Sequence, residues 1–560
     1  MHRTLQIPEL LRLVFEEVYV DNDFCWSTLA ALVRTCRIFH DVGIRILWYH
    51  LPHLGPLILC FPSDVLEVFY GPHEQVVCLA RPPNAQDWSR FMHYAAHVQC
   101  LSVEDSGCFT RRLSTMRVAP GVYMTLHVYK PVEHVLPNLS ELSWCHGSGL
   151  DRQMEDLQSL RLALGPKVDT LLIKCFSKLD DALVLRYNQT LEDFIRDAPV
   201  LHCVTFIGTQ MHSSTQDLAP RLLQKQYRLR VFSMCTGVGG RMSAQTLLCL
   251  SQLPMLHAAT FQCGELTAAE KGILSSTQAL YPPSFPSLQT ATFFAQNAAD
   301  CAPVLGLAAT SRLRDLRIDT FSAPRASELR QLFSDIVKDY ADLLDTLVVS
   351  SMTPASRSDT SYTITPDVLQ PLFALKNVVH ISIAPRCPIK IDDATVKDIA
   401  KAWPQIRILN LGIHGRRFNN AQQVTLKSLM SLAQHCRNLQ DLGLSFDTAV
   451  GPISEAYDEQ HHLLDGLCNR RLSVLRVCTS KLPERRDDVE VLTRFLADVF
   501  PKLKKIHTAW INSLDFDALD REQDFEDPGW DEEWAEVNRS LVEICAIRKL
   551  ERRQVAPQVK

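Results

Sequence analysis

The sequence predicts an α/β fold in two parts: three short N-terminal helices, and behind them a long array of strand–helix repeats. Two observations predict it. Residues 7–51 carry apolar residues at helical spacing, and from about residue 97 one strand-like motif recurs through most of the 560-residue chain. We expect the repeats to stack into an irregular horseshoe, with parallel strands on its concave face and helices outside.

The N-terminal part contains three helical patterns. The first follows one helical face, at Leu10, Leu11, Val14, Phe15 and Val18. The second begins at a predicted N-cap, Ser27, and continues to Phe39. Gly43 interrupts this pattern, and a third short segment ends at Trp48. Because three helices in about 45 residues bury a core poorly, we predict that a partner completes their apolar surface.

The order of residues in this segment resembles an F-box. The resemblance is carried by Ile7-Pro8-Glu9-Leu10-Leu11, Val14-Phe15, Leu32-Val33, Thr35-Cys36-Arg37, Phe39 and Leu47-Trp48. The segment departs from the family pattern in two ways. Ile7 stands in place of the usual leading leucine, and Glu9 follows Pro8 directly, one residue closer than usual.

The resemblance implies that residues 1–51 bind a Skp-type adaptor and, through it, the cullin complex of an SCF-type ubiquitin ligase. The residues that it places at the adaptor are Ile7, Pro8, Leu10, Leu11, Val14, Phe15, Leu32, Val33, Cys36, Phe39, Leu47 and Trp48. The alternative is that these helices form an ordinary N-terminal cap on the domain that follows.

Residues 52–96 form an apolar connector. Leu54, Leu57 and Phe61 lie among prolines, and a flexible connector would expose such side chains to water. We therefore predict that the connector is rigid, which would hold a bound substrate at a fixed distance from the ligase.

The repeat array occupies residues 97–512. Its motif is an apolar residue, two variable residues, a second apolar residue, one variable residue and a third apolar residue. The first apolar anchors are Val98, Leu139, Val168, Leu201, Leu229, Leu256, Leu288, Leu313, Leu344, Val378, Ile406, Leu439, Leu472 and Leu503. After a first gap of about 40 residues, the copies recur every 25–34 residues, which is the period of leucine-rich repeats or slightly above it.

A proline lies two residues before the first anchor in many copies, at Pro137, Pro199, Pro254, Pro286, Pro404 and Pro501. Because proline stops a helix, we predict that each strand follows a helix at an equivalent corner. The whole chain resembles F-box leucine-rich-repeat proteins, in the style of the large F-box sets of mushroom-forming fungi. A doubly wound α/β domain is the alternative, but no strand is followed by the Gly-rich phosphate loop typical of that class.

Residues 513–560 differ in composition from the array. Ten acidic residues between Asp515 and Glu533 are interspersed with Phe and Trp, and a helix is predicted from Val537 to Arg553. We predict that this tail covers the open end of the array, which needs a polar cap. The alternative is an acidic, aromatic arm that touches the substrate surface.

One residue in each strand, between the second and third anchors, is predicted to face the concave side. This row begins with hydroxyl-bearing residues and becomes more basic towards the C-terminus. The candidate substrate-binding residues on it or beside it are Arg317, Asn410, Arg407, Arg476, Lys505 and His507. Such a surface suits an acidic or phosphorylated partner, or the chain's own acidic tail.

The composition argues against several other classes. A net charge of -5 and a pI of about 6.4 provide no basic field for a nucleic acid. The 18 cysteines are scattered without CxxC pairs, which predicts reduced thiols in a cytoplasmic or nuclear protein and no metal site. No run of 18 apolar residues predicts a membrane span, and Pro8 and Glu9 break any signal peptide.

The sequence contains no GxSxG, HExxH or P-loop motif. We therefore predict no enzymatic activity and no cofactor. Two functions remain: the substrate receptor of a ubiquitin ligase, which acts by proximity alone, or a leucine-rich-repeat scaffold that never meets an adaptor. A hydrolase would need a nucleophile and a base in register, and no such set can be placed.

Overall fold

The computed structural model forms two compact units, Met1–Ala259 and Thr260–Lys560. The residues that the structure describes are 7–20, 25–70, 75–103, 116–119, 121–146, 159–175, 189, 192, 201–208, 218–235, 240–280, 284–356, 359–412, 423–451, 467–478, 480–508 and 528–555. The boundary between the units falls inside the predicted array, at the strand that begins at Ala258.

A large sheet contains 15 strands in the order β1-β4-β6-β7-β8-β9-β10-β11-β12-β13-β14-β15-β16-β17-β18, and its recorded pairings are parallel. The strands up to the boundary are β1 (His50–Leu51), β4 (Cys100–Val103), β6 (Glu141–His146), β7 (Thr170–Cys175), β8 (Cys203–Gly208), β9 (Val231–Cys235) and β10 (Ala258–Cys263). The others are β11 (Thr290–Ala295), β12 (Asp315–Thr320), β13 (Thr346–Ser351), β14 (His380–Ala384), β15 (Ile408–Leu411), β16 (Asp441–Leu444), β17 (Val474–Arg476) and β18 (Lys505–His507).

The predicted stack of parallel α/β repeats is confirmed, because each of the predicted motifs supplies one strand. The remaining strand, β1, comes from the end of the N-terminal helical segment and pairs with β4 through Leu51 and Leu101. A two-residue strand carries no sequence period of its own, so only its pairing reveals it.

Alternation of side chains explains the burial along each strand. In β12, Leu316 and Ile318 are fully buried towards the helices, while Asp315 and Arg317 are partly exposed on the other face. We call this second face the open face. The register pairs Leu316 with Leu347 of β13, so apolar side chains of neighbouring repeats stack on one another.

The corners before the strands are equivalent, as the recurring prolines predict. The N–H of the first anchor donates to the carbonyl three residues earlier, for example from Leu439 to Cys436 at 3.1 Å and from Leu503 to Phe500 at 3.0 Å. The residue before most strands then accepts two N–H bonds from the next repeat; for example, the carbonyl of Arg314 accepts from Asp345 and Thr346. These bonds set the spacing of the repeats.

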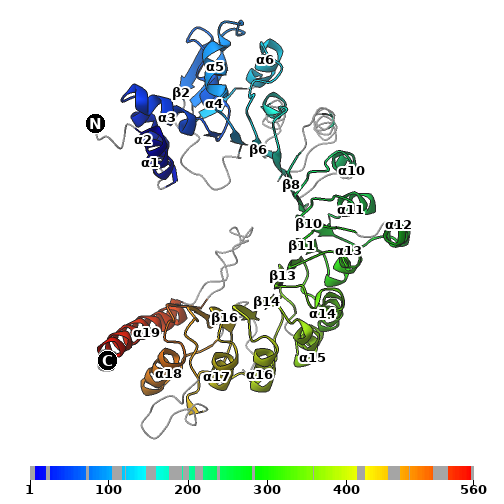
Figure 1. Cartoon of the computed structure of the whole chain (residues 1–560), viewed down its shortest axis with the longest axis vertical. Coiled ribbons are helices and arrows are strands. Elements are labelled where there is room, and N and C mark those ends of the chain that lie inside the picture. Colours follow the sequence, from blue (N-terminus) through cyan, green and yellow to red (C-terminus); the bar gives the residue numbers. More distant parts are fainter. Residues whose placement is uncertain are drawn as a thin grey trace. The chain divides into compact units, whose positions relative to one another are not determined.

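Within each unit, the helices that connect successive strands from β8 to β18 lie on one side of those strands (Figure 1). The structure describes helices in both units. Those of the N-terminal unit are α1 (Pro8–Val20), α2 (Cys25–Val33), α3 (Arg37–Leu47), α4 (Gly55–Ile58), α5 (Trp88–Ala95), α6 (Val122–Tyr129), α10 (Leu218–Leu223) and α11 (Ala244–Ser251). Those of the C-terminal unit are α12 (Ala268–Leu280), η2 (Ala298–Cys301), α13 (Ala302–Leu307), α14 (Ala326–Tyr340), η3 (Thr360–Tyr362), α15 (Pro366–Leu369), η4 (Gln370–Ala374), α16 (Asp393–Ala402), α17 (Leu426–His435), α18 (Arg486–Val499) and α19 (Pro528–Val555). None of these helices is both long enough and apolar enough to cross a membrane, within the part of the chain described.

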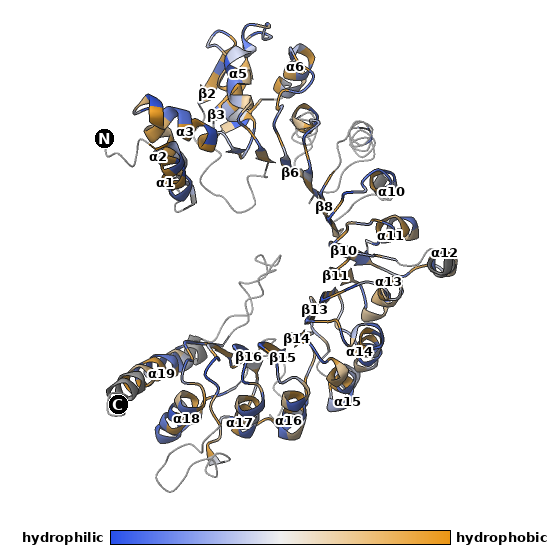
Figure 2. Ribbon diagram, viewed as in Figure 1, coloured by the Kyte–Doolittle hydropathy of each residue, from blue (hydrophilic) through white to orange (hydrophobic). Residues whose placement is uncertain are grey.

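Side-chain caps begin several helices and join neighbouring ones. The Asp392 carboxylate caps α16 by accepting from the N–H of Thr395 at 2.8 Å. Asp393 accepts from the N–H of Thr425 at 2.8 Å, which links the start of α16 to the start of α17. Both helices carry hydrophobic and hydrophilic residues on different sides (Figure 2), as amphipathic helices against a sheet do.

A second sheet was not predicted. It contains β2 (Leu66–Tyr70), β3 (Gln75–Leu79) and β5 (Met116–Val118), in the order β2-β3-β5. β2 and β3 form an antiparallel hairpin, and β5 joins β3 in parallel from a segment almost 40 residues away. The predicted connector, residues 52–96, is therefore a folded layer of helices and strands.

α19 packs against α18 and β18 at the end of the large sheet. Trp534 is buried there, and its indole N–H donates to the carbonyl of Ser480 at 3.0 Å. The Asn538 side chain accepts from the N–H of Ile506 in β18 at 3.1 Å. The acidic segment from Asp515 to Asp527 lies outside the described residues.

Candidate functional site

The N-terminal bundle, which we define as α1, α2 and α3, has its own small core. Leu11, Phe15 and Leu29 are buried, and Phe39 packs edge-on against Phe15 with ring centroids 5.4 Å apart. The helices differ from the predicted ones in two places. Ser27 lies inside α2 rather than capping it, and the chain turns between Val33 and Arg37.

Gly43 does not interrupt a helix but lies within α3, at the point of closest approach to its neighbours. A Cβ at this position would lie 2.6 Å from Val33 Cγ2 and 2.8 Å from Phe15 Cε2. The missing side chain therefore allows α3 to pack against α1 and α2, and the sequence signal of a helix breaker marks a close contact instead.

The predicted adaptor-binding residues divide into three groups. Leu11, Phe15 and Val33 are buried, and their side chains hold the bundle together. The half-buried residues are Leu32, Phe39, Leu47 and Trp48, and the exposed ones are Ile7, Pro8, Leu10, Val14 and Cys36. The exposed group is therefore the most accessible to a partner in the folded bundle.

An exposed apolar stripe runs along α1 from the residue before it, and is formed by Ile7, Leu10, Leu13 and Val14. Their exposed fractions are 45%, 38%, 61% and 47%. Sequence reasoning missed Leu13, although it lies one helical turn after Leu10. Solvent-exposed apolar side chains this close together mark a binding surface more often than isolated ones do.

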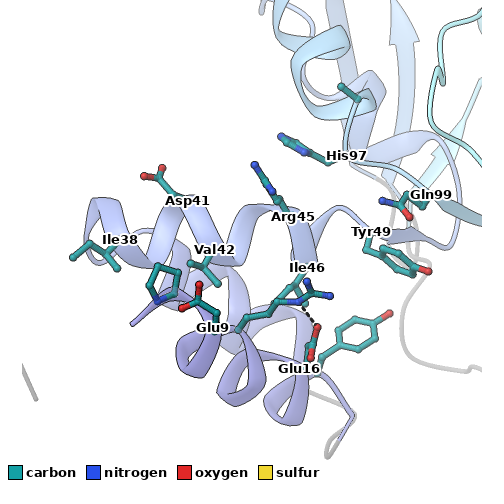
Figure 3. A pocket seen from close by; sticks show the side chains of 14 residues that line it. Glu9, Glu16, Ile38, Asp41, Val42, Arg45, Ile46, Tyr49, His97 and Gln99 are labelled. Atoms are coloured by element: carbon teal, nitrogen blue, oxygen red, sulfur yellow. Dashed lines mark hydrogen bonds and ion pairs between the residues drawn. The ribbon is translucent and has the colours of Figure 1, made fainter. Parts of the chain in front are cut away.

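A groove of about 1160 Å³ lies on the opposite side of α1, between α1 and α3 (Figure 3). Arg12 and Glu16 line it from α1, two positions along from Leu10 and Val14 and therefore on the other side of the helix. The remaining lining residues are Pro8, Glu9, Tyr19, Ile38, Asp41, Val42, Arg45, Ile46, Tyr49, Ala96, His97 and Gln99. The apolar stripe and the groove are thus separate surfaces of one helix.

The bundle is tied to the large sheet by several contacts. Trp48 stacks on Tyr94 of α5, with ring centroids 4.5 Å apart and planes 11° apart. His50 lies 2.9 Å from the Ser102 hydroxyl through Nε2 and 3.3 Å from the Tyr19 hydroxyl through Nδ1. Backbone pairing of β1 with β4 adds to these contacts, so the bundle is held directly against the sheet.

Four of the candidate substrate-binding residues lie in one row on the open face of the C-terminal unit, but Asn410 is buried there and is therefore not accessible to a substrate. The register pairs Asn410 with Gly443, Gly443 with Arg476, and Arg476 with His507, while Arg317 occupies the same position in β12. Lys505 lies two residues before His507 in β18. Arg407 precedes β15 and is exposed at the beginning of the strands.

Carboxylates neutralise two of the cations in this row. Arg476 donates to both oxygens of Asp441, at 3.1 and 2.8 Å, and both side chains are largely buried. Arg317 donates in the same way to Asp315 at 3.2 and 3.4 Å. At Arg317 and Arg476 the open face therefore presents paired charges, in a hydrogen-bonding strip, rather than free cations.

Two polar side-chain atoms in this strip have no hydrogen-bond partner. Ser382 and Asn410 face each other across β14 and β15, and each is 2% exposed. The Ser382 hydroxyl and the Asn410 Oδ1 atom are buried without a bond. A buried polar group in this state raises the free energy of the fold.

Replacing Asn410 by leucine should stabilise the C-terminal unit by about 1–2 kcal/mol, because it removes a buried carbonyl that has no donor. Urea denaturation followed by circular dichroism measures the change. Asn410→Asp is the matched control and should destabilise, since it buries a charge in the same place. A loss of stability in Asn410→Leu would show that the Asn410 side chain forms a hydrogen bond in the folded protein in solution.

Two histidines on the open face have a lowered pKa. Burial lowers the pKa of His380 below its ordinary value, and Arg317 lowers it further. Burial also lowers the pKa of His507, with Arg476 and Lys505 adding to the effect. In the N-terminal unit, burial lowers the pKa of His53.

A lowered histidine pKa means that the fold favours the neutral ring. The stability gained is present above the unfolded pKa of about 6.5 and is lost as the pH falls below it towards the folded pKa. We therefore expect the urea concentration at the unfolding midpoint of the C-terminal unit to decrease when the pH is lowered from 7.5 to 5.5. His380→Gln should reduce this fall, and an equal fall in the variant would exclude His380 as a cause.

The chain shares low sequence identity with two solved structures. No protein-family model matches it, and no curated protein does. Among solved structures, it is similar to the complex of Rad7 and Elc1 in yeast, at 13% identity and a TM-score of 0.35, over 70% of this chain and 82% of that one. It is also similar to the Toll–Spatzle complex of Drosophila, at 10% identity and a TM-score of 0.32, over 80% of this chain and 45% of that one. Both TM-scores are below 0.5, so neither likeness bears on the function of this chain.

Proposed function

We propose that the chain is the substrate-recognition subunit of an SCF-type cullin-RING ubiquitin ligase. The N-terminal bundle binds a Skp-type adaptor, and the open face of the C-terminal unit binds the substrate protein. The observation that supports this best is the apolar stripe Ile7, Leu10, Leu13 and Val14. It lies in the segment that resembles an F-box, on the helix whose other face already fills the core of the bundle.

In this role the chain holds the substrate in place and carries out no chemical step itself. A receptor of this kind raises the local concentration of a substrate lysine near the ubiquitin-carrying enzyme. Holding a fixed distance requires a stiff link between adaptor and substrate surfaces. The Trp48–Tyr94 stack and the His50–Ser102 bond support stiffness where the bundle meets the large sheet.

The paired charges on the open face favour a substrate segment that is recognised by hydrogen bonds and shape. A phosphate would have to displace Asp441 from Arg476, or Asp315 from Arg317, before it gained a bidentate contact. We therefore propose that this strip binds a protein segment of mixed polarity and does not depend on phosphorylation.

The double substitution Leu10→Asp and Val14→Asp should reduce adaptor affinity about 100-fold or more, because each buried anchor at an interface is worth about 2 kcal/mol. Co-purification and calorimetry with a Skp-type adaptor measure the loss. The thermal midpoint should be unchanged, since both side chains are exposed. Leu11 is unsuitable for this test because it is fully buried.

The matched control is Leu59→Asp, which places the same charge on another exposed leucine, at the end of α4. It should leave adaptor binding intact. If the wild-type chain itself shows no adaptor binding at micromolar concentration, the alternative holds: a repeat scaffold without a role in a ligase.

A further inference from the structure

β2 is an edge strand of the small sheet. Its only hydrogen-bonding neighbour among the described strands is β3, which β5 joins on the far side. The edge of β2 that faces away from β3 thus presents backbone groups without a strand to pair with.

The register identifies these backbone groups. The carbonyl of Val65 accepts from the N–H of Ala80 at 2.9 Å, which makes Val65 and Ala80 a hydrogen-bonded pair at the start of the hairpin. Pairs alternate along an antiparallel ladder, so Glu67 and Phe69 also bond to β3. The N–H and C=O groups of Leu66, Val68 and Tyr70 point the other way.

This edge lacks the features that usually block strand addition. The sequence Leu66-Glu67-Val68-Phe69-Tyr70 contains no proline, its register with β3 runs without a bulge, and it carries one charge. Val, Phe and Tyr favour strands. Phe69 and Tyr70 are 52% and 76% exposed, so large apolar surface lies beside the free backbone.

Two side chains on one face of β2 indicate what could pair with it. Glu67 and Phe69 are exposed on the same face, next to Cys78 and Val76 of β3. Within the described residues, Glu67 forms neither an ion pair nor a side-chain hydrogen bond. A strand added antiparallel to β2 would place one residue opposite Phe69 and, two positions later, another opposite Glu67.

We propose that β2 binds an extended segment of a partner protein by strand addition. The segment runs antiparallel to β2 and carries a large apolar residue followed two positions later by a lysine or arginine. The apolar residue packs beside Phe69, and the cation pairs with Glu67. This surface is separate from the apolar stripe of α1, and the proposal does not depend on the adaptor.

The test uses the full chain and a synthetic peptide, acetyl-Thr-Val-Phe-Val-Lys-Val-Thr-amide. Hydrogen exchange at millimolar peptide should slow at the amides of Leu66, Val68 and Tyr70 and stay unchanged in the large sheet. Fluorescence anisotropy of a labelled peptide gives the affinity. Val68→Pro removes the central outward N–H, keeps the ladder to β3 and should weaken binding about tenfold or more.

Glu67→Lys supplies a test that does not involve the backbone. It should weaken binding about threefold to tenfold, and a peptide with glutamate in place of lysine should regain that loss in the variant. If circular dichroism shows that Val68→Pro is unfolded, this charge exchange alone tests whether the peptide binds at β2.

Three outcomes would overturn the proposal. The peptide could slow hydrogen exchange at amides outside β2, or its affinity could be the same for the wild type and for both variants. Alternatively, sedimentation could show a dimer that Val68→Pro abolishes, in which case the edge pairs with a second copy of this chain and not with a partner segment.

Discussion

Replacing Trp534 by alanine should cost the C-terminal unit about 3–5 kcal/mol, the usual loss when a fully buried tryptophan is truncated. The indole is 1% exposed, and its N–H satisfies the carbonyl of Ser480 at 3.0 Å. Its loss should release α19 from β18 and α18. The last strand would then expose an unpaired edge, so we also expect aggregation at lower protein concentration than for the wild type.

Urea denaturation and hydrogen exchange in α19 measure this effect. Val542→Ala is the matched control, because it removes an exposed apolar side chain from the same helix. It should change the stability by less than about 0.5 kcal/mol. If Trp534→Ala unfolds at the same urea concentration as the wild type, α19 does not stabilise the end of the sheet.

The second large effect is expected at Gly43. Alanine normally stabilises a helix by about 1 kcal/mol relative to glycine, yet Gly43→Ala should destabilise the N-terminal bundle by about 1–3 kcal/mol. The new Cβ would approach Val33 and Phe15 to 2.6 and 2.8 Å, and the branched valine has little freedom to move. Adaptor binding should weaken because α3 separates from α1.

Gly272→Ala is the control for Gly43→Ala. Gly272 also lies inside a helix, α12, but a Cβ there meets no atom within 4 Å. This substitution should stabilise its helix by up to about 1 kcal/mol. Thermal denaturation of both variants measures the contrast. A gain of stability in both would mean that α3 can move away from its neighbours at no cost.

The two substitutions in the N-terminal bundle separate folding from recognition. Leu10→Asp with Val14→Asp changes the exposed stripe and should leave stability intact, whereas Gly43→Ala should reduce stability and adaptor binding together. The sequence alone could not assign these roles, because Leu10 and Leu11 belong to the same apolar pattern. Only the packing of α2 and α3 decides which of them faces inward.

The sequence by itself determined the repeat architecture. Each strand buries one face against a helix, so alternate positions must be apolar, and that local requirement is visible at every anchor from Val98 to Leu503. The helix-to-strand corners were equally visible, because proline cannot continue a helix. The resemblance of residues 7–51 to an F-box also needed no structure.

Only the tertiary structure decided the features that arise from contacts between residues far apart in the chain. The pairing of Arg476 with Asp441 joins positions 35 residues apart, and the strand register creates it. The free edge of β2 follows from the pairing of β3 with both β2 and β5. Periodicity records which side of an element is buried, but it does not record which element lies on the other side.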